Sequence, residues 1–487
     1  PHIDMFQKIL SKIGATATKI ESMTSGQIFN GCLILHQASY NHYAYRNRKD
    51  IKFVIALNLS TIPALMFCGC TNLELIYAPK VVRIEDGSYK NGVCCGSFSQ
   101  TALTNINFPV LEYVGESAFN SCQKMLSVDL PLCQRISNMA FQHCTALVDI
   151  NIQNVKEMGY SAFQECSSTV ALSFPEVETI GNEAFKECVS LVDIAIQNVQ
   201  TIGNGCFHLC KSLLKLSIPL VKKINGLSFF MCNSLMEVEM RSVEYIGESA
   251  FFNCGSLVNL SVSYVKEIGN YAFSECVQLT KVSFLNALYI SSEAFSQCSS
   301  LKDVFLPRVE RIGERAFRLC ASLVKININS AKRIGGGAFY RCSSLVSLKC
   351  PTAKDIDCDV FSNCTNLASI SIPIANEVKS CFCNCVKLRS IDTNMGPNIF
   401  KCRNYECNRK KQCPICKGEL KICLERGKLQ KFEENLIEKR TSQRTKLHIW
   451  QMLLRSQVQK NYEIQKLVDL MEEVFGLLIS AVEFGEE

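Results

Sequence analysis

The stretch Val243–Val262 reads VEYIGESAFFNCGSLVNLSV, and its pattern decides the fold. Apolar residues stand eight and five positions before Phe251, a cysteine stands three after it, and apolar residues return six, nine and eleven after it. The frame recurs every 22 residues, so twelve phenylalanines follow one another without a slip from Phe119 to Phe361. Such a fixed period is typical of a repeat solenoid, because each unit buries its apolar edge against an identical neighbour.

Beyond this block the frame persists with altered lengths. Phe382 comes one residue early, Phe98 lacks the following cysteine, and Phe67 precedes Phe98 by 31 residues. Phe29 with Cys32 is interpreted as a degenerate first unit. The extra length lies around Glu85 to Cys95 and is rich in Gly, Ser and Asn, so we interpret it as a loop bulging from one unit. Counting each unit as one rung, the sequence predicts roughly 14 to 16 rungs, mostly of 22 residues.

Each rung is expected to contain a short parallel strand. In Leu147–Ile152 the last apolar residues, Ile150 and Ile152, alternate with polar ones, which is the period of two of a strand. Gly247 and its equivalents stand four residues before the Phe, and we interpret them as a tight backbone turn that a side chain would obstruct. The fold class predicted is therefore a leucine-rich repeat solenoid with a parallel β-sheet, followed by an α-helical C-terminal tail.

Two stretches show the consensus of the repeat most fully, Leu213–Ile224 (LLKLSIPLVKKI) and Ile246–Cys254 (IGESAFFNC). In these residues the chain resembles the BspA-type, or Treponema-type, leucine-rich repeats, and the resemblance extends over about residues 55 to 395. The resemblance implies the fold directly. It also implies a surface antigen, an adhesin or an interaction protein, of kinds found in bacteria and expanded in anaerobic protists.

The cysteines follow the repeat. Fifteen of the 29 stand three residues after a Phe of the frame. Stacking in register places their Cβ atoms about 4.8 Å apart, beyond the roughly 3.5 to 4.5 Å of a disulfide. We therefore predict a ladder of reduced, buried cysteines, which behave as small hydrophobes and suit a reducing compartment. Some of the cysteines off this ladder would pair if the protein were exported.

The surface of the repeat is expected to be polar. Positions eight and ten after each Phe point to the strand surface, taken as concave, and carry small and mixed-charge residues with Phe305 as the one aromatic. This pattern favours either a solvated face or a broad protein-binding surface. Charges seven before the Phe predict stacked pairs, which contribute little to stability. These pairs are Lys156 with Glu178, Glu244 with Lys266, and Glu310 with Lys332.

The composition changes after Gly396-Pro397. Four cysteines follow, at Cys402, Cys407, Cys413 and Cys416. Four thiolates at these spacings suit a tetrahedral, structural zinc ion, with reduced free cysteines and disulfides as alternatives. The segment also resembles the last half of a RING-type finger, which implies a ubiquitin-ligase-like adaptor, although the first half and the usual His are absent.

A heptad pattern begins at Leu447. With a polar Asn at one a position it predicts a coiled-coil homodimer, and an amphipathic helix that caps the last rung is the alternative. Its a and d residues include Leu447, Trp450, Leu454, Asn461, Ile464, Val468, Met471, Phe475 and Leu478. Residues 401 to 466 hold 17 Lys and Arg against 7 Asp and Glu, but without a nucleic-acid motif we interpret them as solvated helix charges and do not expect nucleic acid as a partner.

The expected domains are an N-terminal cap over 1–55, the solenoid over 56–396, the Cys-rich segment over 397–425 and the helical tail over 426–487. No apolar run approaches the length of a membrane span. Pro1 to Ile20 lacks the apolar core of a signal peptide, so we expect a cytoplasmic protein, or a cell-surface or secreted one if an export signal precedes Pro1. No catalytic motif is present, and we expect no enzyme. The favoured function is a protein–protein interaction scaffold, with a microbial surface adhesin or antigen as the alternative.

Overall fold

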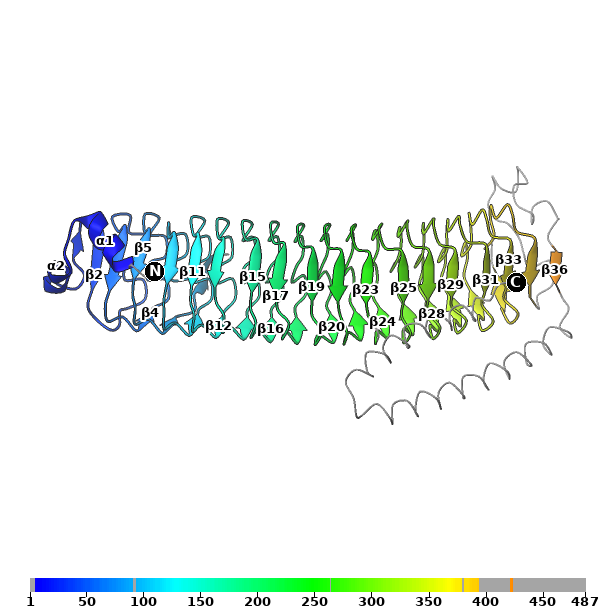
Figure 1. Ribbon diagram of the computed structural model, residues 1–487, viewed down its shortest axis with the longest axis horizontal. Coiled ribbons are helices and arrows are strands. Elements are labelled where there is room, and N and C mark those ends of the chain that lie inside the picture. The colour runs from blue at the N-terminus through cyan, green and yellow to red at the C-terminus, as the bar shows by residue number, and fades with distance from the viewer. Residues whose placement is uncertain (1–4, 91–92, 263, 379–380, 394–420, 424–487) are drawn as a thin grey trace, which may run out of the picture. The chain divides into compact units, whose positions relative to one another are not determined.

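The computed structural model describes residues 5–90, 93–262, 264–378, 381–393 and 421–423. Within this part the chain forms a solenoid whose rungs follow one another in sequence order, from blue to yellow in Figure 1. Each regular rung contains one strand of three residues and one of two. Equivalent strands of neighbouring rungs pair in parallel and in register within sheets of two to eight strands, as Glu237–Glu239 does with Asn259–Ser261. The predicted leucine-rich repeat solenoid is confirmed.

The longer strands form the first ladder. They are β3 (Phe53–Ala56), β5 (Leu75–Tyr77), β9 (Asn105–Asn107), β11 (Ser127–Asp129), β13 (Asp149–Asn151), β15 (Ala171–Ser173), β17 (Asp193–Ala195), β19 (Lys215–Ser217), β21 (Glu237–Glu239), β23 (Asn259–Ser261), β25 (Lys281–Ser283), β27 (Asp303–Phe305), β29 (Lys325–Asn327), β31 (Ser347–Lys349), β33 (Ser369–Ser371), β35 (Ser390–Asp392) and β36 (Lys421–Cys423). Most of these strands bury only their central residue, as the alternation predicts.

The shorter strands form the second ladder. They are β4 (Thr61–Ile62), β6 (Arg83–Ile84), β10 (Tyr113–Val114), β12 (Arg135–Ile136), β14 (Glu157–Met158), β16 (Thr179–Ile180), β18 (Thr201–Ile202), β20 (Lys223–Ile224), β22 (Tyr245–Ile246), β24 (Glu267–Ile268), β26 (Tyr289–Ile290), β28 (Arg311–Ile312), β30 (Arg333–Ile334), β32 (Asp355–Ile356) and β34 (Glu377–Val378). In most of them the first residue is exposed and the second is buried in the core.

A continuous stack of aromatic rings fills the core. From Phe119 to Phe361 neighbouring ring centroids lie 4.9 to 5.7 Å apart, with planes within 12° of parallel. Phe98, Phe67 and Tyr45 extend the stack at one end and Phe382 at the other, which makes sixteen rings. This number agrees with the predicted 14 to 16 rungs.

The cysteine ladder runs beside the rings. From Cys122 to Cys364 these thiols are free and buried, which confirms the predicted reduced ladder. Each donates a hydrogen bond to the carbonyl oxygen of the Phe in the preceding rung, as Cys254 does to Phe229 over 3.0 Å. Because the thiols are desolvated, burial raises their pKa, to about 12 at Cys188. The thiol therefore joins neighbouring rungs while remaining protonated.

The third side of each rung is an irregular turn that surrounds the Phe. Three N–H groups of one rung donate to carbonyl oxygens of the next, as those of Ser249, Phe251 and Asn253 do over 2.7 to 2.8 Å. Ser249 and Asn253 have left-handed φ values of 52° and 53°. Equivalent positions, two before and two after the Phe, are left-handed in nearly every rung although few are glycine. The hydrogen bonds between rungs offset the strain of these conformations.

The predicted glycine turn requires a correction. At Gly203, four residues before its Phe, φ lies outside the left-handed region, so the backbone does not require glycine for its conformation. A Cβ atom at Gly203 would instead lie 2.3 Å from the backbone nitrogen of Asn182 and 2.4 Å from the carbonyl carbon of Gly181. Glycine is present because the backbones of adjacent rungs approach closely there.

Two interpretations of the N-terminal region also change. The extra length before Phe98 is not only a loop: β7 (Ser88–Lys90) and β8 (Val93–Cys95) pair antiparallel within it as a hairpin. Phe29 with Cys32 is not a first rung, because these residues pair across the antiparallel strands β1 (Ile28–Phe29) and β2 (Cys32–Leu35). Tyr45, 22 residues before Phe67, provides the first ring instead.

Two helices precede the solenoid, α1 (Met5–Ile13) and α2 (Ala17–Ser22). They pack their apolar residues against the outward face of the first strands, where Phe53 and Leu75 are buried. Among the described residues, helices cover the strand face at its beginning and none covers it from β9 onward. In the described part of the chain, α1 has nine residues and α2 has six, so both helices are too short to cross a membrane.

Candidate functional site

The open strand face is polar, as predicted, and many of its side chains satisfy one another. Asp129 accepts hydrogen bonds from the amides of Asn107 and Asn151, one rung away on either side, both over 2.7 Å. Ser217 donates to Glu239 over 2.7 Å in a shallow hollow between β17, β19 and β21. Because such groups are already paired within the chain, a ligand gains little by replacing their partners.

The predicted charge pairs are formed in two of three places. Lys266 lies 2.7 Å from Glu244, and Lys332 lies 2.9 Å from Glu310. Lys156 and Glu178 are adjacent in the stack, yet no ion pair joins them among the described residues. Exposed pairs contribute only about 0 to 1 kcal/mol, so a long side chain can extend into water instead.

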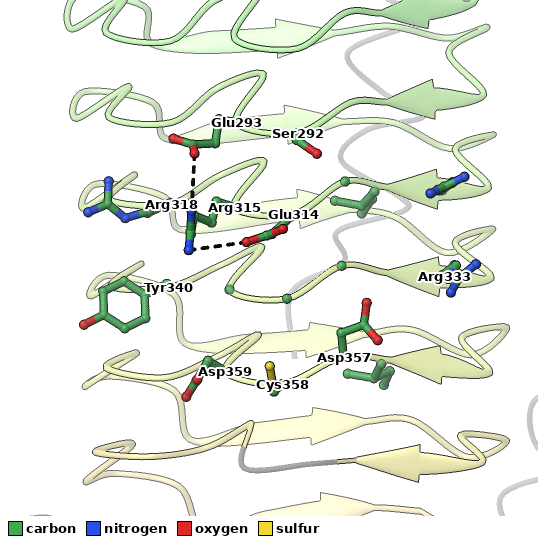
Figure 2. Close-up of a pocket in the computed structure, with 17 residues that line it drawn as sticks. Ser292, Glu293, Glu314, Arg315, Arg318, Arg333, Tyr340, Asp357, Cys358 and Asp359 are labelled. Atoms are coloured by element: carbon green, nitrogen blue, oxygen red, sulfur yellow. Dashed lines mark ion pairs between the residues drawn. The ribbon is translucent and has the colours of Figure 1, made fainter.

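A hollow lies on the turn side, over the rungs of Phe317, Phe339 and Phe361 (Figure 2). Its volume is about 980 Å³. Its lining includes Arg311, Arg315, Arg318, Arg333, Tyr340, Glu293, Glu314, Asp357, Cys358 and Asp359. We call it the triglycine hollow, because Gly335, Gly336 and Gly337 also line it.

Missing side chains create this hollow. Gly335, Gly336 and Gly337 stand four, three and two residues before Phe339, where most rungs carry side chains at the last two positions. The rungs on either side do carry side chains there, including Glu314 and Arg315 on one and Cys358 and Asp359 on the other. The turn side is therefore hollowed over one rung and bordered by its neighbours.

The charges in the hollow are unevenly paired. Arg315 lies 3.6 Å from Glu293 and 3.3 Å from Glu314, as the dashed lines in Figure 2 show. Arg311, Arg318 and Arg333 form no ion pair with any residue in the described ranges.

Arginine and tyrosine side chains border the hollow. Arg318 and Tyr340 lie on one side of the hollow and Arg333 on the other (Figure 2). Arg and Tyr are side chains that dominate protein–protein interfaces energetically.

The sequence interpretation missed this hollow, because it considered only the glycine four residues before each Phe, which is Gly335 in this rung. The available signal was the pair Gly336 and Gly337, since no other rung from Phe119 to Phe361 has glycine both three and two residues before its Phe. It becomes meaningful only when the rungs are stacked, since Arg333, Arg318 and Tyr340 then surround it.

The predicted zinc ligands Cys402, Cys407, Cys413 and Cys416 lie outside the described residues, as does the heptad segment from Leu447 to Leu478. Within the described ranges, no three His, Cys, Asp or Glu side chains gather as a metal site would require. The zinc site and the coiled-coil dimer therefore stay predictions.

Comparison with known proteins identifies the repeat. The family model described as "BspA type Leucine rich repeat region (6 copies)" matches residues 38–95, 92–214, 200–320 and 288–408. A leucine-rich repeat protein from Bacteroides ovatus is 26% identical, with a TM-score of 0.52, over 63% of this chain and 84% of that chain.

Two further solved structures are less alike. A leucine rich cell surface protein from Faecalibacterium prausnitzii is 19% identical over 63% of this chain and 86% of its own, with a TM-score of 0.32. The pneumococcal vaccine antigen PcpA is 17% identical over 67% and 85%, with a TM-score of 0.33. No curated protein matches the chain.

Proposed function

The chain belongs to the family of BspA-type leucine-rich repeat proteins, and on that premise we propose that it is a non-enzymatic scaffold for protein–protein interaction. The observation that carries the proposal is the triglycine hollow, which Arg318, Arg333 and Tyr340 border. Arginine and tyrosine contribute strongly to binding when a partner desolvates them.

The core supports a scaffold role in a second way. The apolar residues of the frame are used in stacking one rung on the next, and the rings from Phe67 to Phe382 are buried. The surface residues are therefore free to change without loss of the fold, while the solenoid holds them at fixed spacing. Such rigid presentation reduces the entropy lost on binding.

The experiment is capture of partners with the full chain. The chain is immobilised, exposed to an extract of its source organism, and compared with a double variant, Arg318→Ala with Tyr340→Ala. We expect at least one protein that binds the parent and is lost from the double variant, while circular dichroism shows an unchanged fold. A matched variant on the strand face, Lys281→Ala, controls for general surface effects.

Two results would reject the proposal. One is the recovery of no protein beyond those that an unrelated repeat solenoid also binds. The other is turnover of a small-molecule substrate by the purified chain, because the proposal describes a protein without catalytic chemistry.

Three predictions from the sequence extend the proposal. We propose that the tail adds a structural zinc site at Cys402, Cys407, Cys413 and Cys416, that its heptads pair two copies of the chain, and that the protein is cytoplasmic. Metal analysis of the intact protein tests the first, and its mass in solution tests the second. Microscopy of the protein in its own cells tests the third.

A further inference from the structure

The turn side contains a column of backbone N–H groups three residues before each Phe, and in four of the twelve rungs from Phe119 to Phe361 a side chain caps this group. The N–H three residues before each Phe faces the rung before it, where an Asn or Asp side chain can accept its hydrogen bond. The N–H group of Asn204 donates to Asn182 Oδ1 over 2.8 Å, and that of Ser292 donates to Asn270 Oδ1 over 3.1 Å. Tyr160 and Glu116 are capped in the same way, by Asn138 and Asp86.

The rungs of the triglycine hollow are among those without this cap, and here the uncapped groups coincide with a hollow bordered by arginines. The N–H groups of Glu314, Gly336 and Cys358 occupy this position in three successive rungs and line the hollow. None has a hydrogen-bond partner in the described part of the chain. The reason lies in the sequence, because the residues 22 positions earlier are Ser292, Glu314 and Gly336 rather than Asn or Asp.

Arginines flank these open donors. Arg311 and Arg333 are neighbours in the second ladder and are exposed, and Arg318 stands across the hollow from Arg333. Because Arg315 already pairs with Glu293 and Glu314, the cations available to a ligand are Arg311, Arg318 and Arg333. Guanidinium groups and free N–H groups together present donors for carboxylate and carbonyl oxygens.

The acidic residues of the hollow restrict the ligand further. Asp357 and Asp359 border one end, and Asp359 accepts a hydrogen bond from the Ser362 hydroxyl over 2.8 Å. A continuous polyanion such as a nucleic acid would bring phosphates against these carboxylates. A peptide can instead place single carboxylates opposite Arg318 and Arg333 and direct neutral backbone elsewhere.

We propose that the triglycine hollow binds an acidic peptide segment of a protein partner, whose carboxylate and carbonyl oxygens accept hydrogen bonds from the N–H groups of Gly336 and Cys358 and from the flanking arginines. This inference rests on the proposed scaffold function and gives it a location and a partner chemistry. The segment takes the place that an Asn or Asp side chain occupies in the four capped rungs.

The test uses a substitution that the repeat itself supplies. Gly336→Asn introduces the residue that caps this column in other rungs, so it should supply an acceptor for the Cys358 N–H and also fill the hollow. Gly226→Asn is the matched control, because Gly226 stands at the same position five rungs earlier. A Cβ atom at either glycine would lie 3.3 Å from the carbonyl oxygen of the residue 22 positions later, so both variants face the same packing.

Binding is measured by fluorescence anisotropy with a labelled oligo-glutamate peptide and the full chain, with an oligo-glutamine peptide for comparison. We expect Gly336→Asn and Arg333→Gln each to weaken oligo-glutamate binding by about tenfold or more, because each removes charge-assisted or backbone hydrogen bonds. Gly226→Asn should bind as the parent does, and the oligo-glutamine peptide should bind weakly to all of them.

Three results would overturn the inference. They are equal binding by Gly336→Asn and the parent, absence of oligo-glutamate binding by the parent, and tighter binding of a single-stranded oligonucleotide than of the peptide. If the parent captures a protein partner but fails in this assay, the location and chemistry proposed here are wrong while the scaffold function stands. If the parent neither captures a protein partner nor binds oligo-glutamate, the scaffold function and the peptide site are both wrong.

Discussion

Removing one ring from the aromatic stack tests how much the core depends on contacts between rungs. Phe251 is fully buried, with its centroid 4.9 Å from that of Phe229 and 5.1 Å from that of Phe273. The next residue, Phe252, points to the turn surface, is partly exposed, and stacks on Phe230 at 5.0 Å. Two adjacent phenylalanines thus provide a substitution and its control.

The expected magnitudes follow from these surroundings. Phe251→Ala leaves a cavity in a close-packed core, which costs about 3 to 5 kcal/mol. We expect the upper part of this range, because two stacked neighbours each lose about 0.5 to 1.5 kcal/mol of ring contact. Phe252→Ala removes one such ring contact and a ring that is only partly buried. We therefore expect it to lower the free energy of unfolding by about 1 to 2 kcal/mol.

Urea unfolding of both variants, followed by circular dichroism, measures the difference. The free energy of unfolding of Phe251→Ala should be lower than that of Phe252→Ala by about 3 kcal/mol. Equal destabilisation of the two variants would refute the reasoning, since a buried stacked ring would then matter no more than one on the surface.

Three other outcomes are expected. Burial raises the pKa of the ladder thiols from 9.0, to about 11 at Cys122 and about 12 at Cys188, so the folded chain keeps protons that the unfolded chain releases. The contribution of these thiols to the free energy of unfolding should therefore be complete below about pH 8. It should fall as the pH rises through these pKa values, by up to about 1.4 kcal/mol per pH unit for each thiol. A urea midpoint that is unchanged between about pH 7 and 10 would contradict this. Gly203→Ala should lower the free energy of unfolding by about 1 to 3 kcal/mol, because its Cβ atom would lie 2.3 Å from a backbone atom of the neighbouring rung. Gly255→Ala should not lower it, because no atom would lie nearer than 3.9 Å to its Cβ atom. Equal urea midpoints of the two variants would contradict the explanation by close backbone approach. Iodoacetamide should modify the exposed Cys358 in the native protein and reach Cys188 only after unfolding, as peptide mass spectrometry would show, and early reaction at Cys188 would argue against a closed core.

The parts of the fold that were predictable from the sequence are those that repeat. The ring at Phe251 and the thiol at Cys254 have identical neighbours in the rungs on either side, so local spacing determines their tertiary contacts. The alternation in Leu147–Ile152 similarly identifies the strand face. A regular stack converts a one-dimensional pattern directly into packing.

The features that the sequence did not reveal depend on contacts between rungs or on breaks in the repeat. Tyr45 lacks the following cysteine, so its place in the ring stack is evident only from the parallel ring of Phe67. The left-handed φ at Glu183 and similar residues is imposed by hydrogen bonds between rungs, against the preference of the side chain. The triglycine hollow depends on which side chains of three rungs become neighbours, and no single rung contains that information.

The account's central claim is that each rung is stabilised by direct contact with its immediate neighbours, and a double-mutant cycle measures that contact. Phe251→Leu is combined with Phe273→Leu, one rung away, and separately with Phe317→Leu, three rungs away. The account predicts a coupling free energy of about 0.5 to 1.5 kcal/mol for the adjacent pair and additivity within about 0.5 kcal/mol for the distant pair. Additive effects for Phe251 and Phe273 would contradict it.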